Sequence, residues 1–175
     1  GSNFQVFVTQ GKSDKVKVVY DSDIDRYATV DVRYHSGRLS LVLKQERQIK
    51  SWTNDNKVEV YLEMDDINSI DLSGAAKATF AGNFKTEDLD IDISGAAALY
   101  DLSISGQSLD ADLSGASNAD ITGSFPKKVD IDMSGAAKMK LNVDSETLKG
   151  DVSGAGKFIC SGNFKECHIC CTGAS

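Results

Sequence analysis

The tetrad Ser-Gly-Ala-small recurs six times in the last two thirds of the 175-residue chain, and no other feature restricts the fold as strongly. Self-similarity at a fixed period of about 20 residues is typical of solenoids, in which each repeat stacks on its neighbours. Consecutive tetrad glycines are 19 to 21 residues apart. The copies are Ser73–Ala76, Ser94–Ala97, Ser114–Ser117, Ser134–Ala137, Ser153–Gly156 and Thr172–Ser175.

The residues before the tetrads alternate between apolar side chains and aspartate, which is the pattern of a half-buried β-strand. Leu89–Ile93, Leu109–Leu113 and Val129–Met133 show it most clearly. A helix is excluded because no apolar period of about 3.6 residues survives this alternation. An antiparallel sandwich would alternate as well, but it would not return the same residue types in every repeat. We therefore predict an all-β fold, a right-handed parallel β-helix (β-solenoid) with coils of about 20 residues and about three short strands in each.

Stacked coils place equivalent residues in columns, and these columns account for the repeat. Each tetrad glycine would supply a positive φ or a close backbone approach at a corner. Asp101 breaks the alternation after the second tetrad, so we expect a bulge that turns Leu102 inward. The apolar columns expected to face the core are Leu72/Ile93/Leu113/Met133/Val152/Cys171 and Leu89/Leu109/Val129/Leu148/Cys167.

Residues 3–65 lack the repeat, and we predict that they form an N-terminal β-strand cap and the first coil, continuous with a solenoid over residues 66–175. Such a cap covers the apolar end of a solenoid and blocks pairing at its edge. Turns are expected at His35–Gly37 and Asn54–Asn56, and one helical turn at Asp23–Tyr27. The whole chain would then be a single structural domain. The expected strands are Phe4–Thr9, Lys15–Tyr20, Thr29–Tyr34, Arg38–Leu43 and Lys57–Glu63.

Aspartate recurs at two positions of the repeat, and these residues are the candidate ligand-binding side chains. Stacking would hold neighbouring carboxylates about 5 Å apart, so cations, raised pKa values or hydrogen bonds must offset their repulsion. Calcium is chemically allowed, but no Asp-x-Asp-x-Asp-Gly loop is present, and a solvated acidic face without a metal is the preferred interpretation. The candidates are Asp71, Asp92, Asp112, Asp132 and Asp151 in one column, and Asp90, Asp110 and Asp130 in the other.

Trp52, the single tryptophan, lies in a polar turn region. It is either a contact within the cap or an exposed anchor for a partner or a sugar. The other aromatic residues are scattered along the chain, which predicts no stacking platform for single-stranded nucleic acid. The net charge of −7 also disfavours a nucleic-acid partner. The sequence contains no apolar run of about 18 residues that would span a membrane, and it shows no signal peptide.

Four cysteines lie within the last 16 residues. Strand alternation places Cys160, Cys167 and Cys171 inward and Cys170 outward. Buried core thiols are the first interpretation, whereas disulfides and a metal site are alternatives that the sequence leaves open.

No catalytic residues are predicted. The two histidines, His35 and His168, have no evident nucleophile partner, so a Ser-His-Asp triad is unsupported. Successive coils repeat the same pair of carboxylates, so no single place in the chain stands out as an active site.

The Asp-apolar-Ser-Gly-Ala repeat, preceded by the segment Phe4–Gly11, resembles the head GIN domain family of auto-transporter adhesins, which is common in Bacteroidetes. The resemblance covers about residues 3–175. It implies a β-helix-like fold, a surface or adhesive role and an extracytoplasmic location, often as a lipoprotein or a secreted protein. It implies no catalytic residues.

The leading functional hypothesis is therefore a non-enzymatic module for surface binding or adhesion. It would act without a cofactor in the periplasm, on the outer-membrane surface or as a secreted protein, and bind a cell-surface protein or a polysaccharide. The first alternative is a carbohydrate-binding or carbohydrate-active β-helix protein. The second is a structural envelope protein that forms homo-oligomers through the ends of the solenoid.

Overall fold

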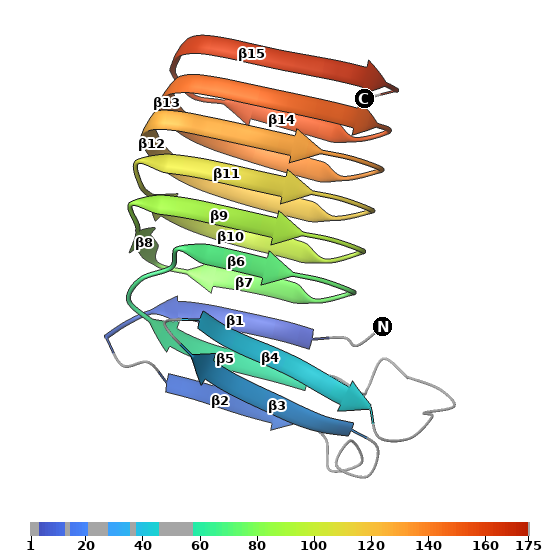
Figure 1. The fold of residues 1–175 in the computed structure, drawn as a ribbon. Helices are drawn as coiled ribbons and strands as arrows, with labels where there is room; N and C mark the ends of the chain where they lie inside the picture. Colours follow the sequence, from blue (N-terminus) through green and yellow to red (C-terminus); the bar gives the residue numbers. More distant parts are fainter. Residues whose placement is uncertain (1–3, 13–14, 21–27, 36–37, 46–57, 175) are drawn as a thin grey trace.

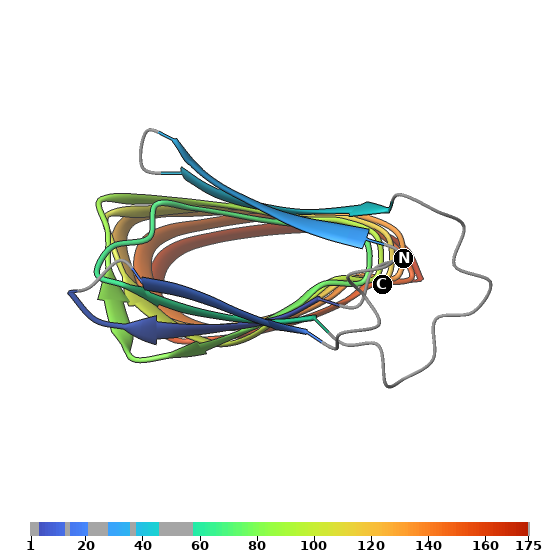
Figure 2. The ribbon, with the colours of Figure 1, turned by 90° about the horizontal axis from the view of Figure 1, so that it is seen from below.

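The computed structural model describes residues 4–12, 15–20, 28–35, 38–45 and 58–174, with side-chain environments for 4–12, 15–19 and 58–174. Every regular element in these ranges is a β-strand, and the strands stack into a right-handed solenoid (Figure 1). Seen along its axis, the solenoid is flattened, with two long layers facing each other (Figure 2). The predicted all-β solenoid is therefore confirmed. No helix in the described ranges is long and apolar enough to cross a membrane.

One layer, here called the aspartate layer, is the front layer of Figure 1. Its strands pair in parallel with their equivalents one coil away, for example β9 with β11 and β11 with β12. The aspartate layer consists of β6 (Ser69–Leu72), β9 (Asp88–Ile93), β11 (Ser108–Leu113), the second halves of β12 (Asn118–Met133) and β13 (Lys138–Gly154), and β15 (Phe164–Gly173).

The other layer, here called the opposite layer, is also built from parallel pairs one coil apart. The first full coil has three separate strands, as predicted, whereas β12 and β13 each run as one continuous strand through the wide corner, the broad end of the coil opposite the tetrad turns (Figure 2). In its solenoid part, the opposite layer consists of β7 (Lys77–Ala81), β10 (Ala98–Ser105), the first halves of β12 and β13, and β14 (Lys157–Ser161), with β8 (Asn83–Lys85) paired to the end of β10.

The N-terminal segment extends the opposite layer rather than closing it with a separate unit. Strand β1 (Phe4–Gln10) lies between β5 (Val58–Met64) and β7 and is parallel to both. Strand β2 (Lys15–Tyr20) pairs antiparallel with β5 and forms the edge of the layer. The hairpin of β3 (Ala28–His35) and β4 (Arg38–Gln45) lies on the side of the aspartate layer (Figure 2).

All five strands predicted in this segment are present, with ends that differ by at most two residues from those expected. The predicted helical turn at Asp23–Tyr27 and the turn at Asn54–Asn56 lie outside the described residues, as do positions 36 and 37 of the hairpin turn.

The core lies between the two layers and is filled by the predicted columns. Leu89, Leu109, Val129 and Leu148 are each at most 2 % exposed, and they stack in register. The prediction of buried thiols is wrong at the last coil. Cys167 and Cys171 continue the core columns but are exposed, because no described coil stacks on β15.

The Ser-Gly-Ala turns form a ladder along the narrow edge of the solenoid. Gly115 has a φ of +74°, and a Cβ atom there would lie 2.6 Å from the carbonyl oxygen of Gly95 in the coil below. The backbone N–H of Ala116 donates a 2.7 Å hydrogen bond to that same oxygen. Glycine is thus needed both for its backbone conformation and for close stacking.

The predicted bulge is present at Asp101, which has a φ of +58°. The register between β10 and β12 shifts between Leu99 and Leu102. Leu102 is consequently turned into the core and is 1 % exposed.

Candidate functional site

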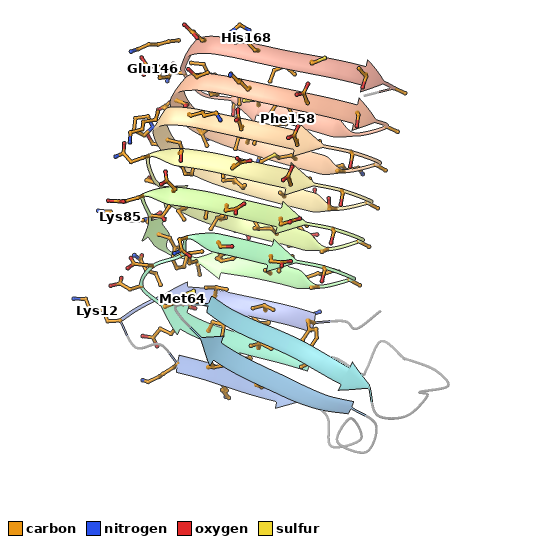
Figure 3. The ribbon with its side chains drawn as sticks, viewed as in Figure 1. Lys12, Met64, Lys85, Glu146, Phe158 and His168 are labelled. Carbon is orange, nitrogen blue, oxygen red and sulfur yellow. The ribbon has the colours of Figure 1, made fainter. Side chains whose placement is uncertain are left out.

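The eight candidate aspartates form two columns on the outer surface of the aspartate layer. In β11 the exposed Asp110 and Asp112 alternate with buried Leu109, Ala111 and Leu113, so the carboxylates point outward. Parallel in-register stacking repeats this alternation from coil to coil, as the rows of side chains in Figure 3 show. The columns are Asp71, Asp92, Asp112, Asp132 and Asp151, and Asp90, Asp110 and Asp130, here called the acidic face.

Carboxylates stacked at the strand spacing repel one another. Two unit charges about 5 Å apart repel by about 1 kcal/mol in water and about 3 kcal/mol at an effective dielectric of 20. Partial desolvation, followed by the charges of Asp132, Asp110 and Asp92, raises the pKa of Asp112 above its ordinary value. Desolvation also raises the pKa of Asp110, with Asp130 as the strongest charged contributor. The charges on Asp110 and Asp112 therefore destabilise the folded state at neutral pH.

A lysine relieves part of this repulsion in the shorter column. The Lys128 ammonium pairs with Oδ2 of Asp130. It also lowers the pKa of Asp110, which offsets part of the rise that desolvation causes. The other oxygen of Asp130, Oδ1, is buried without a hydrogen-bond partner. In the next coils Lys149 and then His168 occupy the same column, so its acidic run ends at Asp130.

A shallow hollow of about 200 Å³ lies where the acidic face meets the tetrad turns. Carboxylates and serine hydroxyls alternate around it, and Ser153 Oγ donates a 3.2 Å hydrogen bond to the carbonyl oxygen of Met133. Within the described ranges, no group of three or more His, Cys, Asp or Glu side chains is placed to hold a metal ion. The polar lining residues are Asp112, Ser114, Asp132, Ser134, Asp151 and Ser153.

Replacing Asp112 by asparagine is expected to stabilise the fold at pH 7 by about 0.5–1 kcal/mol, after allowance for solvent screening. A raised pKa means that the native state binds the proton more tightly than the unfolded chain. The penalty therefore grows as pH rises from about 4 through the raised pKa, and it disappears below about pH 4. Urea unfolding at pH 7 and pH 3.5 measures this difference.

The matched control for Asp112→Asn is Asp120→Asn on the opposite layer. The Asp120 carboxylate lies 3.4 Å from Lys140 Nζ, so its removal should leave stability unchanged or slightly lower. Equal stabilisation by both substitutions, or a gain from Asp112→Asn that persists at pH 3.5, would contradict repulsion within the acidic face.

The other candidate residues named from the sequence do not form one site with the acidic face. Trp52 lies outside the described residues. His168 lies on β15 in register with Lys149 (Figure 3), and it makes no hydrogen bond to a serine or a carboxylate in the described part of the chain. Burial raises the pKa of the Cys160 thiol to about 11, with Cys167 adding to the shift, so Cys160 stays protonated at neutral pH.

Sequence reasoning missed one cluster of side chains. Phe7 and Tyr61 stack with their ring centroids 5.1 Å apart on the outer surface of the opposite layer. This contact was not predicted, because the two residues lie far apart in the sequence. The only signal in the sequence is their outward position in two predicted strands, and nothing there shows that β1 pairs with β5.

These features define a parallel β-solenoid with a flat, carboxylate-rich outer face. The chain belongs to the family described as "Putative auto-transporter adhesin, head GIN domain", whose sequence model matches residues 1–128. The resemblance stated from the repeat is thus confirmed.

Among solved structures, the chain is similar to a putative adhesin from Bacteroides fragilis, with a TM-score of 0.66 and 13 % sequence identity. The match covers 98 % of this chain and 89 % of the other, and it supports the fold. A search of curated proteins finds no match.

Proposed function

We propose that the chain is a non-enzymatic, extracytoplasmic adhesion module whose acidic face binds a positively charged surface of a protein partner. The observation that carries this proposal is the in-register stacking of eight aspartates on one flat outer surface. Membership in a family of auto-transporter adhesins supports the adhesive role and the location.

Two outward aspartates at the centre of the acidic face, Asp110 and Asp112, lower the stability of the folded state, as their raised pKa values indicate. Aspartate is depleted in β-strands, and like charges on neighbouring strands destabilise a sheet. Serine or threonine at the same outward positions would keep the alternation without the repulsion. Residues that cost stability while contributing nothing to packing are the ones expected to serve binding.

The geometry of the acidic face also suits adhesion. The carboxylates repeat at the strand spacing on a rigid sheet, so several of them can meet a basic surface at once. Complementary charge guides the encounter between partners and favours the correct one, and its effect weakens as salt screens it.

Binding to surface-immobilised poly-lysine tests the charge requirement directly. The triple variant Asp92→Asn/Asp112→Asn/Asp132→Asn is expected to bind about tenfold more weakly than the parent chain at low salt. This variant should also be more stable than the parent, so lost binding cannot result from unfolding.

The charge-matched control is Asp65→Asn/Asp66→Asn/Glu87→Gln, which removes three exposed acids outside the acidic face. It should bind nearly as tightly as the parent chain. If both triple variants weaken binding equally, net charge rather than the acidic face governs adhesion, and the proposal is wrong. It is equally wrong if the first triple variant binds like the parent.

A further inference from the structure

The outer surface of β1, β5 and β2 carries a second cluster, on the opposite layer and thus away from the acidic face (Figure 2). The strand registers place outward side chains there in a three-by-three grid. Tyr61 occupies its centre, with Glu59 and Glu63 beside it along β5. The rows are Thr9–Glu63–Lys15, Phe7–Tyr61–Lys17 and Gln5–Glu59–Val19, here called the tyrosine grid.

Tyr61 is held in place by its neighbours while remaining 41 % exposed. Its ring stacks on Phe7 with an angle of 19° between the ring planes. Its hydroxyl donates a 2.9 Å hydrogen bond to Glu59 Oε2. Lys17 Nζ lies 5.9 Å from the ring centroid on a different strand. An aromatic ring fixed in this way presents apolar surface at little entropic cost on binding.

A hollow of about 280 Å³ adjoins Tyr61. Glu63, which lines this hollow, packs against Gly11, where a Cβ atom would overlap its side chain. The absence of a side chain at Gly11 therefore leaves room for Glu63 in this position. The lining residues are Thr9, Lys15, Lys17, Tyr61, Leu62 and Glu63.

We propose that the tyrosine grid binds one ring of a neutral polysaccharide. A pyranose has an apolar C–H face that can lie against Tyr61 and a rim of hydroxyls that both donate and accept hydrogen bonds. The carboxylate of Glu63 accepts from these hydroxyls, and the ammonium of Lys15 donates to them.

The charges and size of the tyrosine grid favour this ligand over charged ones. Two carboxylates and two ammonium groups give the tyrosine grid no net charge, so it offers neither an anion nor a cation the excess of opposite charge that would favour it over a neutral ligand. The hollow is smaller than the roughly 300–1,000 Å³ of typical pockets for drug-sized ligands. It therefore accommodates a single ring, and the rest of a polysaccharide would continue over the open surface.

Affinity electrophoresis in gels containing a mannan, a β-glucan or a galactan tests the proposal, with polygalacturonate as the anionic comparison. The parent chain is expected to be retarded by at least one of the neutral polymers and not by polygalacturonate. Tyr61→Ala should weaken that binding about tenfold, whereas Tyr61→Phe keeps the ring and should stay within about threefold. Gly11→Ala, which displaces Glu63 without touching Tyr61, should also weaken it.

Tyr100→Ala is the matched control, because Tyr100 is 36 % exposed on the same layer and lies in register with Thr79, outside the grid. It should bind like the parent chain. The proposal is overturned if no neutral polymer retards the parent, if polygalacturonate retards it more, or if Tyr61→Ala binds like the parent while retaining its thermal unfolding midpoint. The Asp92→Asn/Asp112→Asn/Asp132→Asn variant should keep sugar binding, which separates this site from the adhesive role of the acidic face.

Discussion

Replacing Gly115 by alanine is expected to destabilise the solenoid by about 2–4 kcal/mol. Two costs add at this position. An L-residue with a side chain is strained at a φ of +74°, and the new Cβ would approach the Gly95 carbonyl oxygen to 2.6 Å. The clash would push two coils apart at the turn and weaken the 2.7 Å hydrogen bond between Ala116 N–H and that oxygen. Urea unfolding of the purified variant measures the loss.

Gly74→Ala separates the two costs. Gly74 has nearly the same φ, +72°, but a Cβ atom there would meet nothing within 4 Å. The Gly74→Ala variant should therefore lose only the stability that the strained φ costs, about 1–2 kcal/mol. Equal losses of stability in both variants would show that the close approach of the neighbouring turn adds nothing to the cost of a side chain at these glycines.

Phe125→Ala is expected to destabilise the chain by about 3–5 kcal/mol. Phe125 is fully buried at the wide corner of the solenoid, and it pairs in register with Ser145 of the next coil, which is 8 % exposed. Ser145 is too small to fill the cavity that the missing ring would leave. The loss should appear as a lower urea midpoint and as increased binding of a hydrophobic dye to the corner.

Tyr100→Ala serves as the control, because this side chain is partly exposed and contributes little to the core. Its cost should stay below about 1 kcal/mol. A loss of under about 1.5 kcal/mol for Phe125→Ala would mean that the corner collapses around the missing ring and that the columns tolerate repacking.

Most of the solenoid could be predicted because its pairing follows the repeat. A period of about 20 residues sets the register between coils, and period-two alternation sets which side chains face inward. The bulge at Asp101 was predictable for the same reason, since a strand accommodates one extra residue in a repeated pattern by forming a bulge. The columns of the acidic face follow from the repeat as well, whereas their role in binding is a proposal.

Pairings between strands outside the repeat could not be predicted. No pattern in β1 indicates that it lies between β5 and β7, because parallel partners far apart in sequence share no local signal. The contact between Phe7 and Tyr61 depends entirely on this insertion. The exposure of Cys167 and Cys171 was missed because alternation gives the direction of a side chain but not what covers it.

The amino-acid sequence by itself determined the coil length, the stacking register and the two aspartate columns. In each case the cause is local, since short-range alternation and a fixed repeat act on every coil in the same way. The tertiary structure alone decided the neighbours of β1 and the assembly of the tyrosine grid. These features depend on which distant segments pack together, and that choice is made by the free energy of the whole chain.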